Sequence, residues 1–262
     1  MLRDKGIFLH GGVGIGFVPK TPATPFASSI KEQSSKESSR TLLHYAHQLG
    51  YPVAYAQEQN GQLIQNILPV HKTEAQQIST SSKVELALHT ESAFHPYKPD
   101  YILLLCLRGD DKAATTYASV NEIIESLSNE VVKSLKQPWY RTAVDDSFRT
   151  KGEPQKEFII PILSEVDEKM TITYDNFFMR GINEYANMAL AELNYAIKKC
   201  TREIVLKTGD LLVIDNSTAI HGRKPFQARY DGTDRWVQRM LVRKELPPEN
   251  HIEGNVITTK FG

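Results

Sequence analysis

The sequence predicts a mostly β protein, a jelly roll with flanking α-helices. Its apolar and β-branched residues gather in many short segments separated by turn-forming residues, which is typical of sandwiches and barrels. Only three segments have helical spacing, and they are too few and too irregularly placed for a repeated βαβ sheet. The glycines of residues 11–16 do not form a dinucleotide-binding motif, because Phe17 stands where G-x-G-x-x-G requires its last glycine.

The segments expected to be strands are short, apolar and bounded by turn signals. They are residues 6–11, 52–56, 62–70, 84–91, 101–108, 157–163, 169–175, 203–207, 210–216 and 235–244.

Three helices are expected from apolar spacing. The first follows a Ser-rich and charged segment, residues 28–40, and ends at Gly50. The second begins at Ser119 as N-cap and ends before Pro138, and the third covers about residues 182–200. The residues expected to be buried are Leu42, Leu43, Ala46 and Leu49 in the first helix; Val120, Ile123, Ile124, Leu127, Val131, Val132 and Leu135 in the second; and Tyr185, Met188, Ala189, Leu193 and Ile197 in the third.

We expect a single domain, residues 1–262, in which 20–40 and 145–156 are loops. Basic and acidic residues number 31 each, which argues against a nucleic-acid partner, and no apolar run is long enough to span a bilayer. The N-terminus lacks the pattern of a secretion signal, and Cys106 and Cys200 are expected to be buried, reduced thiols. A cytoplasmic protein without a membrane partner is therefore expected. Its oligomeric state does not follow from the sequence.

The stretch LALHTESAFH, residues 86–95, suggests a metal site. Alternate residues of a strand share a face, so His89 and Glu91 would point to one side while Leu86 and Leu88 point to the other. An imidazole and a carboxylate on one stiff strand supply two ligands of a two-His-one-carboxylate site. That set suits non-haem Fe(II), because it leaves adjacent coordination positions open.

The third ligand must come from another part of the chain. His221 is the preferred candidate, because it follows the apolar strand 210–216 and precedes a glycine. His95 is the alternative, although the strand is expected to have ended before Pro96. A lone histidine is more often a core or surface residue than a ligand, so the metal hypothesis depends on the three residues together.

Two arginines share a face of the strand 235–244. Arg235, Val237 and Arg239 alternate along it, so both guanidinium groups would face the barrel interior. Buried cations are unfavourable unless each meets an anion, and a guanidinium fork matches a carboxylate. Two such forks near an Fe(II) site imply two carboxylate-bearing small molecules. The alternative is a solvated edge strand with exposed arginines.

Three segments resemble one known family. LGYPVAYAQEQNGQLIQNILP, LHTESAFHPYKPDYILLLCLRGDDKAATTYAS and IDNSTAIHGRKPFQARYDGTDRWVQRMLVRK look like the clavaminate synthase-like Fe(II)/2-oxoglutarate oxygenases of the taurine dioxygenase superfamily. The likeness runs from about residue 5 to about residue 245. H-x-E in place of H-x-D, and H-G-R-x-x-F followed by D-G-x-x-R-W, are typical of this subgroup.

The resemblance implies a double-stranded β-helix, a distorted jelly roll. It implies His89, Glu91 and His221 as the Fe(II) ligands, and O2 and 2-oxoglutarate as cosubstrates. Arg235 would bind the distal carboxylate of 2-oxoglutarate. A threonine after RGDD usually assists it, and Thr115 is preferred here over Thr116.

The resemblance also implies substrate contacts. Arg239 would bind the α-carboxylate of an amino acid, and Asp175 falls where related hydroxylases place an acidic substrate contact. Gln59 and Thr80 are weaker matches, for the amino end of the substrate. Arginine-hydroxylating relatives carry a second acid two residues before the Asp175 position, where this chain has Thr173, which weakens an arginine assignment.

The resemblance thus implies hydroxylation of an unactivated carbon of a free L-amino acid, with release of succinate and CO2. A basic or polar substrate, similar to lysine or arginine, is favoured. Hydroxylation is favoured over halogenation because Glu91 keeps the metal carboxylate. One alternative is the same chemistry on a carrier-tethered amino acid or on another small carboxylate or sulfonate. The other is a non-catalytic small-molecule-binding protein of this fold.

Overall fold

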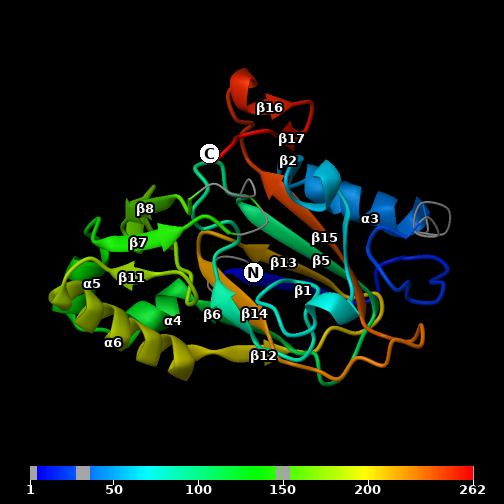
Figure 1. Cartoon of the computed structure of the whole chain (residues 1–262), viewed down its shortest axis with the longest axis horizontal. Helices are drawn as coiled ribbons and strands as arrows, with labels where there is room; N and C mark the ends of the chain where they lie inside the picture. Colours follow the sequence, from blue (N-terminus) through cyan, green and yellow to red (C-terminus); the bar gives the residue numbers. More distant parts are fainter. Residues whose placement is uncertain (1–4, 28–35, 146–147, 149–153, 262) are drawn as a thin grey trace.

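The computed structural model describes residues 5–27, 36–145, 148 and 154–261, and its fold is mostly β (Figure 1). The α-helices are α3 (Lys36–His47), α4 (Val120–Glu125), α5 (Asn129–Leu135) and α6 (Glu184–Cys200), and the short 3₁₀ turns are η1 (Gln59–Gly61), η2 (His71–Thr73) and η4 (Glu249–His251). The strands are β1 (Ile7–His10), β2 (Tyr51–Tyr55), β3 (Gln65–Ile67), β4 (Leu86–His89), β5 (Tyr101–Arg108), β6 (Thr115–Ser119), β7 (Tyr140–Ala143), β8 (Glu157–Ile160), β9 (Leu163–Val166), β10 (Lys169–Ile172), β11 (Arg180–Gly181), β12 (Arg202–Ile204), β13 (Leu211–Asp215), β14 (Ala219–Arg223), β15 (Trp236–Arg243), β16 (Ile252–Glu253) and β17 (Val256–Ile257).

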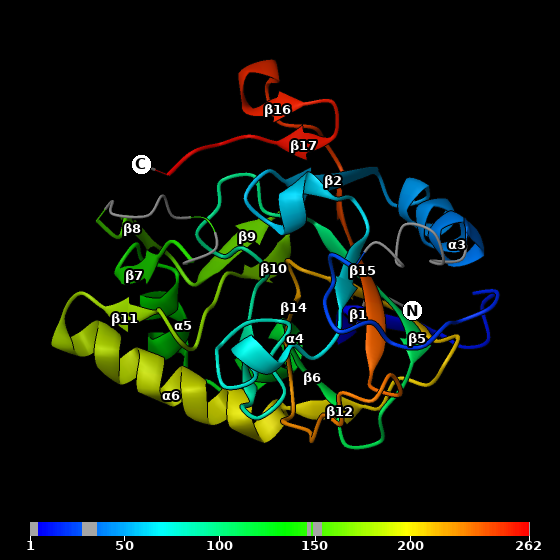
Figure 2. The same ribbon diagram turned by 45° about the vertical axis from the view of Figure 1, so that its right-hand side comes forward.

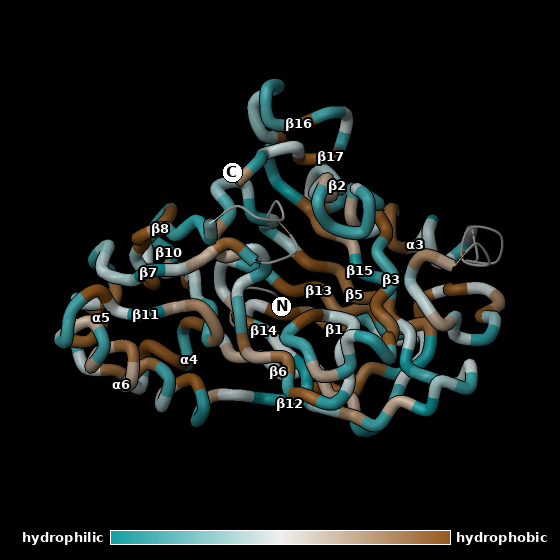
Figure 3. The backbone as a smooth tube through the Cα atoms, in the orientation of Figure 1, coloured by the Kyte–Doolittle hydropathy of each residue, from teal (hydrophilic) through white to brown (hydrophobic). Residues whose placement is uncertain are grey.

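The largest sheet crosses the middle of the molecule. Its strand order is β1-β13-β5-β15-β2-β17-β16, and β3 also pairs with β15. Antiparallel pairing sets Arg239 of β15 opposite Leu104 of β5. On one face, residues such as Leu103 and Met240 pack under α3, where Leu42 is fully buried. Figure 3 shows the hydrophobic course of β5 and β13 through this sheet.

A second sheet has the order β12-β6-β14-β4. Strand β14 lies in its interior, with His221 opposite Tyr117 of β6 on one side and opposite His89 of β4 on the other. One cavity is lined both by this sheet and by β5 and β15 of the large sheet. The two sheets therefore bring β4, β14 and β15, which are far apart in the sequence, to one site.

The helices lie at two sides of this β structure (Figures 1 and 2). Helix α3 covers the large sheet, while α4, α5 and α6 pack together at the other side, next to β7 and β11. Among the described residues, no helix has both the length and the apolar character needed to cross a bilayer.

Helix α3 confirms the first predicted helix, and the other two need corrections. The second is not one helix, because it is broken after Glu125 and restarts at Asn129, where the Ser128 side chain caps the Val131 N–H. The third exists as α6, but Tyr185 and Met188 are 51% and 60% exposed. The predicted Ala189, Leu193 and Ile197 are buried, and Ala186, Leu190 and Ala196 join them in a stripe turned slightly around the helix axis.

Every predicted strand segment contains a strand, but several strands were not predicted. The omissions include β6, β7 and β14, the last of which carries His221. Residues 36–40, expected to be loop, belong to α3, whereas 28–35 lie outside the described residues. In the loop expected over 145–156, residues 146–147 and 149–153 lie outside them as well. Cys106 and Cys200 are free thiols; Cys106 is buried as expected, whereas Cys200 is only partly buried.

Candidate active site

The cavity between the two sheets has a volume of about 410 Å³ and collects most of the charged side chains that the sequence pointed to. Its lining includes Glu58, Gln59, Thr80, His89, Glu91, Thr115, Asp145, Asp175, His221, Arg223, Arg235 and Arg239. All nine predicted site residues are in this set: Gln59, Thr80, His89, Glu91, Thr115, Asp175, His221, Arg235 and Arg239.

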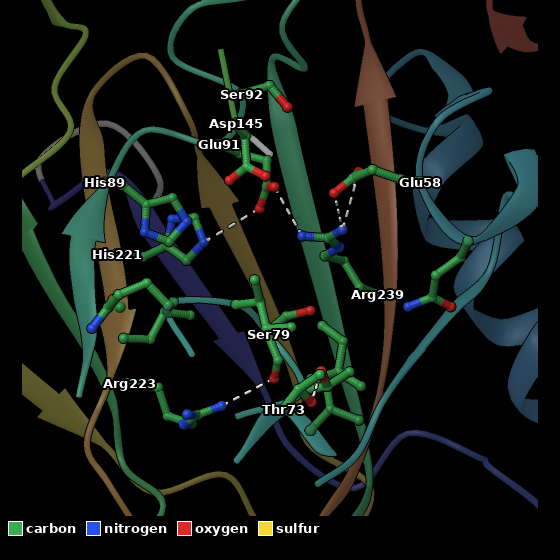
Figure 4. A pocket seen from close by; sticks show the side chains of 18 of the residues that line it. Glu58, Thr73, Ser79, His89, Glu91, Ser92, Asp145, His221, Arg223 and Arg239 are labelled. Atoms are coloured by element: carbon green, nitrogen blue, oxygen red, sulfur yellow. Dashed lines mark hydrogen bonds and ion pairs between the residues drawn. The ribbon is translucent and has the colours of Figure 1, made fainter. Parts of the chain in front are cut away.

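His89, Glu91 and His221 meet at one point of the cavity wall (Figure 4). One ligand atom from each lies within 4.8 Å of the others, and the two imidazole centroids are 4.6 Å apart. The pairing of β4 with β14 causes this approach, since His89 and His221 are directly opposite. His95 does not belong to the group, because its ring is buried against Tyr55 and Phe261.

The local geometry differs from the regular H-x-E strand that the sequence suggested. Strand β4 ends at His89, so Glu91 lies in the turn after it. A register shift between β4 and β14 also places Leu86 in the cavity lining together with His89, although simple alternation would separate them. Glu91 is held instead by Asn216, whose Oδ1 accepts the Glu91 N–H at 2.8 Å and whose Nδ2 donates to the Glu91 carbonyl at 3.1 Å.

The three side chains fit a divalent metal. Glu91 Oε2 and His221 Nδ1 are buried and have no hydrogen-bond partner among the described residues. Glu91 Oε2 faces His221 Nε2 at 3.7 Å. With Nδ1 of His89 donating to the Ala87 carbonyl at 2.8 Å, the Nε2 lone pair of His89 is free for a metal. Two imidazoles and one carboxylate are the donor set of non-haem Fe(II) sites.

The electrostatics keep Glu91 and His221 in their metal-binding forms. Burial, together with the neighbouring His89, lowers the pKa of His221, so its imidazole is neutral at pH 7. Burial would favour a protonated Glu91, but Arg239 and the two histidines outweigh it and hold the pKa of Glu91 well below its usual value. A metal ion would therefore meet an ionised carboxylate and a neutral imidazole.

Arg239 sits between two carboxylates. It donates from Nη1 to Glu91 Oε1 at 2.8 Å and from Nη2 to both oxygens of Glu58 at 3.3 Å, and Gln65 Oε1 accepts from Nε at 2.8 Å. Burial raises the pKa of Glu58, while the Arg239 charge opposes that rise. Arg239 thus faces the interior as predicted, although the chain itself provides its anions.

Arg235 and Thr115 line the cavity from different sheets. Arg235, immediately before β15, is 6% exposed, and in the described part of the chain its guanidinium forms no hydrogen bond or ion pair. Burial lowers the pKa of Arg235, which is the expected effect on a cation without an anion. Thr115 lines the cavity, whereas the neighbouring Thr116 is not part of the lining. This placement favours Thr115 over Thr116.

Asp175, Thr80 and Gln59 line the same cavity but differ in how their side chains are used. Asp175 Oδ1 accepts the N–H groups of Phe177 and Phe178 at 2.7 and 2.9 Å. Thr80 Oγ1 lies 2.9 Å from Thr73 Oγ1. Both ends of the Gln59 amide are bound to the backbone of Asn66, so its role in this structure is to join η1 to β3.

Three charged cavity residues, Glu58, Asp145 and Arg223, were missed by the sequence reasoning. Glu58 adjoins Gln59, and Arg223 belongs to the H-G-R motif, so both lay inside quoted segments. Alternation along β14 would have placed Arg223 beside His221, had β14 been predicted. For Asp145 we find no signal in the sequence.

Comparison with known proteins gives one family and several similar enzymes. Residues 29–241 match the family model described as taurine catabolism dioxygenase TauD, TfdA family. The L-lysine 3-hydroxylase of Catenulispora acidiphila is 32% identical over 258 residues, which cover 95% of this chain and 71% of that protein.

Solved structures of similar enzymes agree with the fold. The asparagine oxygenase complex with Fe(II), 2S,3S-3-hydroxyasparagine and succinate superposes with a TM-score of 0.86 at 31% identity, covering 97% of this chain and 80% of that one. The non-heme iron oxygenase OrfP in complex with Fe and alpha-ketoglutaric acid gives the same TM-score and identity, covering 97% and 82%. OrfP has also been solved with Fe, succinate and (3S)-hydroxy-L-Arg.

Proposed function

The chain belongs to the TauD/TfdA dioxygenase family, and we propose that it hydroxylates an unactivated carbon of a free L-amino acid. It is an Fe(II)- and 2-oxoglutarate-dependent dioxygenase. The single observation that carries the substrate proposal is the ion pair between the buried Arg239 and the partly buried Glu58, next to the His-Glu-His group. A basic or polar amino acid, lysine-like or arginine-like, is the preferred substrate.

We assign His89, Glu91 and His221 as the iron ligands. The unpartnered buried Oε2 of Glu91 and the neutral His221 support the assignment. Iron with O2 and 2-oxoglutarate supplies the oxidation in which a C–H bond becomes C–OH while 2-oxoglutarate becomes succinate and CO2. Arg235, which lacks an anion among the described residues, would hold the distal carboxylate of 2-oxoglutarate together with Thr115.

The Glu58–Arg239 pair suits a zwitterion. An α-amino acid entering between them would give its carboxylate to Arg239 and its ammonium to Glu58, so one ion pair would be replaced by two. No buried charge would be left without a partner. Asp145, which contributes to raising the pKa of Glu58, adds negative charge on the same side. Gln59, whose amide is bound to Asn66, would only support Glu58 in this role.

Replacement of the Glu58–Arg239 ion pair by two ion pairs with the substrate would favour a free amino acid over a tethered one. A carrier-bound thioester has an ammonium for Glu58 but no carboxylate for Arg239. Arg239 would then keep only Glu91 as a charged partner. A sulfonate without an ammonium would occupy Arg239 but would leave the partly buried Glu58 without a positive partner.

The other end of the substrate would meet Asp175, while Thr80 is kept as a weaker candidate contact for the amino end. Asp175 is the acidic residue of the segment 173–181, since Thr173 replaces the second acid of arginine-specific relatives. Its Oδ1 is occupied by two backbone N–H groups, so its second oxygen would receive a substrate donor. One carboxylate oxygen suits the ammonium of a lysine-like side chain better than the wide fork of a guanidinium.

The fold and setting that accompany this function are also proposals. We infer a double-stranded β-helix, in which the sheet of β5 and β15 and the sheet of β4, β6 and β14 form the two halves around the cavity. Residues 1–262 would form a single domain. A cytoplasmic location, a small-molecule partner and no nucleic-acid partner agree with the two free cysteines and the balanced charge.

The test is succinate formation with Fe(II), 2-oxoglutarate and O2 against a panel of free amino acids, with mass spectrometry of the products. His221→Ala and Glu91→Ala are the metal-site controls, and N-acetylated and thioester forms of the best substrate test the zwitterion requirement. Succinate and hydroxylated product with one free amino acid, lost in both variants, is expected. Equal rates with free and tethered forms would contradict the proposal, and no turnover with iron bound would favour a non-catalytic binding protein.

A further inference from the structure

Arg223 occupies a position in the cavity that the assignments above leave without a function. It follows His221 by two residues on β14, so both side chains extend from the same face of the sheet. Both line the cavity. Two residues along a strand correspond to about 6.6 Å. Arg223 therefore lies next to the His89–Glu91–His221 group along the cavity wall, as Figure 4 shows.

The neighbours of Arg223 are the two residues assigned to 2-oxoglutarate. Thr115 of β6 is directly opposite Arg223 in the antiparallel pair, and side chains so placed are close neighbours. Arg235, immediately before β15, lines the same cavity and is near enough for its charge to act on Arg223. Arg223, Thr115 and Arg235 therefore come from three separate segments to one part of the cavity.

This end of the cavity has an excess of positive charge. Arg223 is 4% exposed and donates to the Ser79 carbonyl at 3.0 Å, to Ser81 Oγ at 2.9 Å and to the Lys224 carbonyl at 3.3 Å. All these acceptors are uncharged, and neither Arg223 nor Arg235 forms an ion pair with any described residue. Arg239, by contrast, is balanced by Glu58 and Glu91. Two buried cations without anions are unfavourable unless a ligand brings negative charge.

We propose that Arg223 is a second cationic residue for the distal carboxylate of 2-oxoglutarate, acting beside Arg235. The proposal rests on the proposed function, because it takes 2-oxoglutarate as the molecule whose keto end is held at His89, Glu91 and His221. A dicarboxylate held there by one end has its second carboxylate farther along the cavity. Arg223 and Arg235 would place two positive charges around the single negative charge of the distal carboxylate.

A purely structural role is the competing explanation. The hydrogen bonds to Ser79 and Ser81 fix the segment on either side of Thr80, and Arg223 also stacks on the Phe226 ring at 5.2 Å. Loss of this support would distort the cavity for any ligand. A charge role, however, would be specific for ligands that have the distal carboxylate, so the two explanations predict different ligand dependences.

The experiment is an anaerobic calorimetric titration of the Fe(II)-loaded protein with 2-oxoglutarate and with 2-oxopentanoate. The second ligand keeps the chelating end and replaces the distal carboxylate by a methyl group. Arg223→Gln removes the charge, Arg223→Lys keeps it, and Ser81→Ala removes one bond of the loop contact while leaving the charge. Arg235→Gln tests the cosubstrate assignment of the proposed function.

We expect Arg223→Gln to weaken 2-oxoglutarate binding about 10- to 100-fold, the range for loss of a hydrogen bond to a charged group, with 2-oxopentanoate changed less than about threefold. Arg223→Lys should keep most of the preference for 2-oxoglutarate, and Ser81→Ala should keep all of it. Equal loss for both ligands, or a Ser81→Ala variant that behaves like Arg223→Gln, would overturn the proposal.

The controls separate this inference from the proposed function. If Arg235→Gln loses the preference for 2-oxoglutarate and Arg223→Gln keeps it, only the inference about Arg223 fails. If neither variant alters the preference, the assigned cosubstrate end is itself wrong. Should Arg223→Gln not fold, Arg223→Lys decides, because a lysine cannot make all the guanidinium bonds. If the role of Arg223 is structural, Arg223→Lys should bind both ligands more weakly. If the role is its charge, Arg223→Lys should still prefer 2-oxoglutarate to 2-oxopentanoate.

Discussion

Arg239 and Glu91 are joined by a 2.8 Å hydrogen bond between Nη1 and Oε1, and both side chains are buried. This bond occupies one oxygen of Glu91 and leaves Oε2 facing His221. The residue assigned to the substrate carboxylate therefore also orients a residue assigned to iron. On these assignments, substrate binding and metal binding would both depend on the Arg239 guanidinium.

Substitution of Arg239 should accordingly affect both ligands. We expect Arg239→Gln to raise the KM for the amino acid and to weaken Fe(II) binding roughly 10- to 100-fold, the range for loss of a partner that orients a metal ligand. In Arg239→Lys the KM for the amino acid should rise less than in Arg239→Gln, because lysine keeps the positive charge but lacks the forked guanidinium. Calorimetric Fe(II) titration and steady-state kinetics measure the two effects. Unchanged iron affinity in Arg239→Gln would show that Glu91 does not depend on this bond.

Glu58 should determine whether the substrate must carry a free ammonium. Glu58→Gln removes the negative charge and keeps the size, so we expect kcat/KM for the free amino acid to fall about 10- to 100-fold through loss of one charged hydrogen bond. For the N-acetylated form of the same amino acid, the substitution should lower kcat/KM much less. Glu203→Gln, which removes an exposed carboxylate paired with Lys224, is the matched control. An equal loss for both substrates in Glu58→Gln would contradict an ammonium contact.

The sequence was sufficient for the parts of the site that follow local periodicity. Alternation along 235–244 correctly placed Arg235 and Arg239 on the cavity side, although Arg235 precedes β15 and the register of β15 with β5 shifts between Trp236 and Val237. The metal group could be predicted from His89 and Glu91, although the strand ends between them. A local pattern shows which residues alternate along a segment. The arginine pair and the His89–Glu91 pair could be predicted from that alternation alone.

The remaining parts depend on pairing between distant segments. Glu58 meets Arg239 across 181 positions, and Asn216 meets Glu91 across 125. The register shift that brings Leu86 into the cavity arises only when β4 pairs with β14. Short strands such as β14 also lack a clear apolar pattern, because His221 and Arg223 occupy their cavity face. No single-segment pattern contains this information.

Asn216 should matter for both stability and iron binding. Its amide satisfies the N–H and carbonyl of Glu91 and the Pro99 carbonyl, all in a buried region. Asn216→Ala would leave these groups unpaired, and we expect the free energy of unfolding to fall by about 3 kcal/mol. Because Glu91 would lose its backbone support, Fe(II) affinity should fall as well.

Asn255→Ala is the matched control for Asn216→Ala. Asn255 makes one side-chain bond, to the Pro52 carbonyl, and it lies near β17, away from the metal group. Its loss should lower stability by only about 1 kcal/mol and leave iron affinity unchanged. Urea unfolding and Fe(II) titration check both variants. Identical behaviour of the two would show that Asn216 has no special link to Glu91.

His95 should make the protein less stable in acid. Burial, followed by the charges of Arg243 and His251, lowers the pKa of His95 from 6.5 to about 3 in the folded protein. Between those values the unfolded chain binds a proton that the folded chain does not, so the free energy of unfolding falls as pH falls. The slope from this one group approaches about 1.4 kcal/mol per pH unit below pH 6.

His95→Gln separates this contribution from other titrating groups. Glutamine does not titrate, and its side-chain oxygen can still accept the Tyr97 N–H that His95 Nδ1 accepts at 2.9 Å. The variant should be less stable than the wild type at pH 8, because the ring contacts with Tyr55 and Phe261 are lost, but its stability should change less between pH 7 and pH 5. Urea unfolding at these pH values gives the comparison. Parallel pH profiles for the two proteins would mean that His95 is protonated in the folded state.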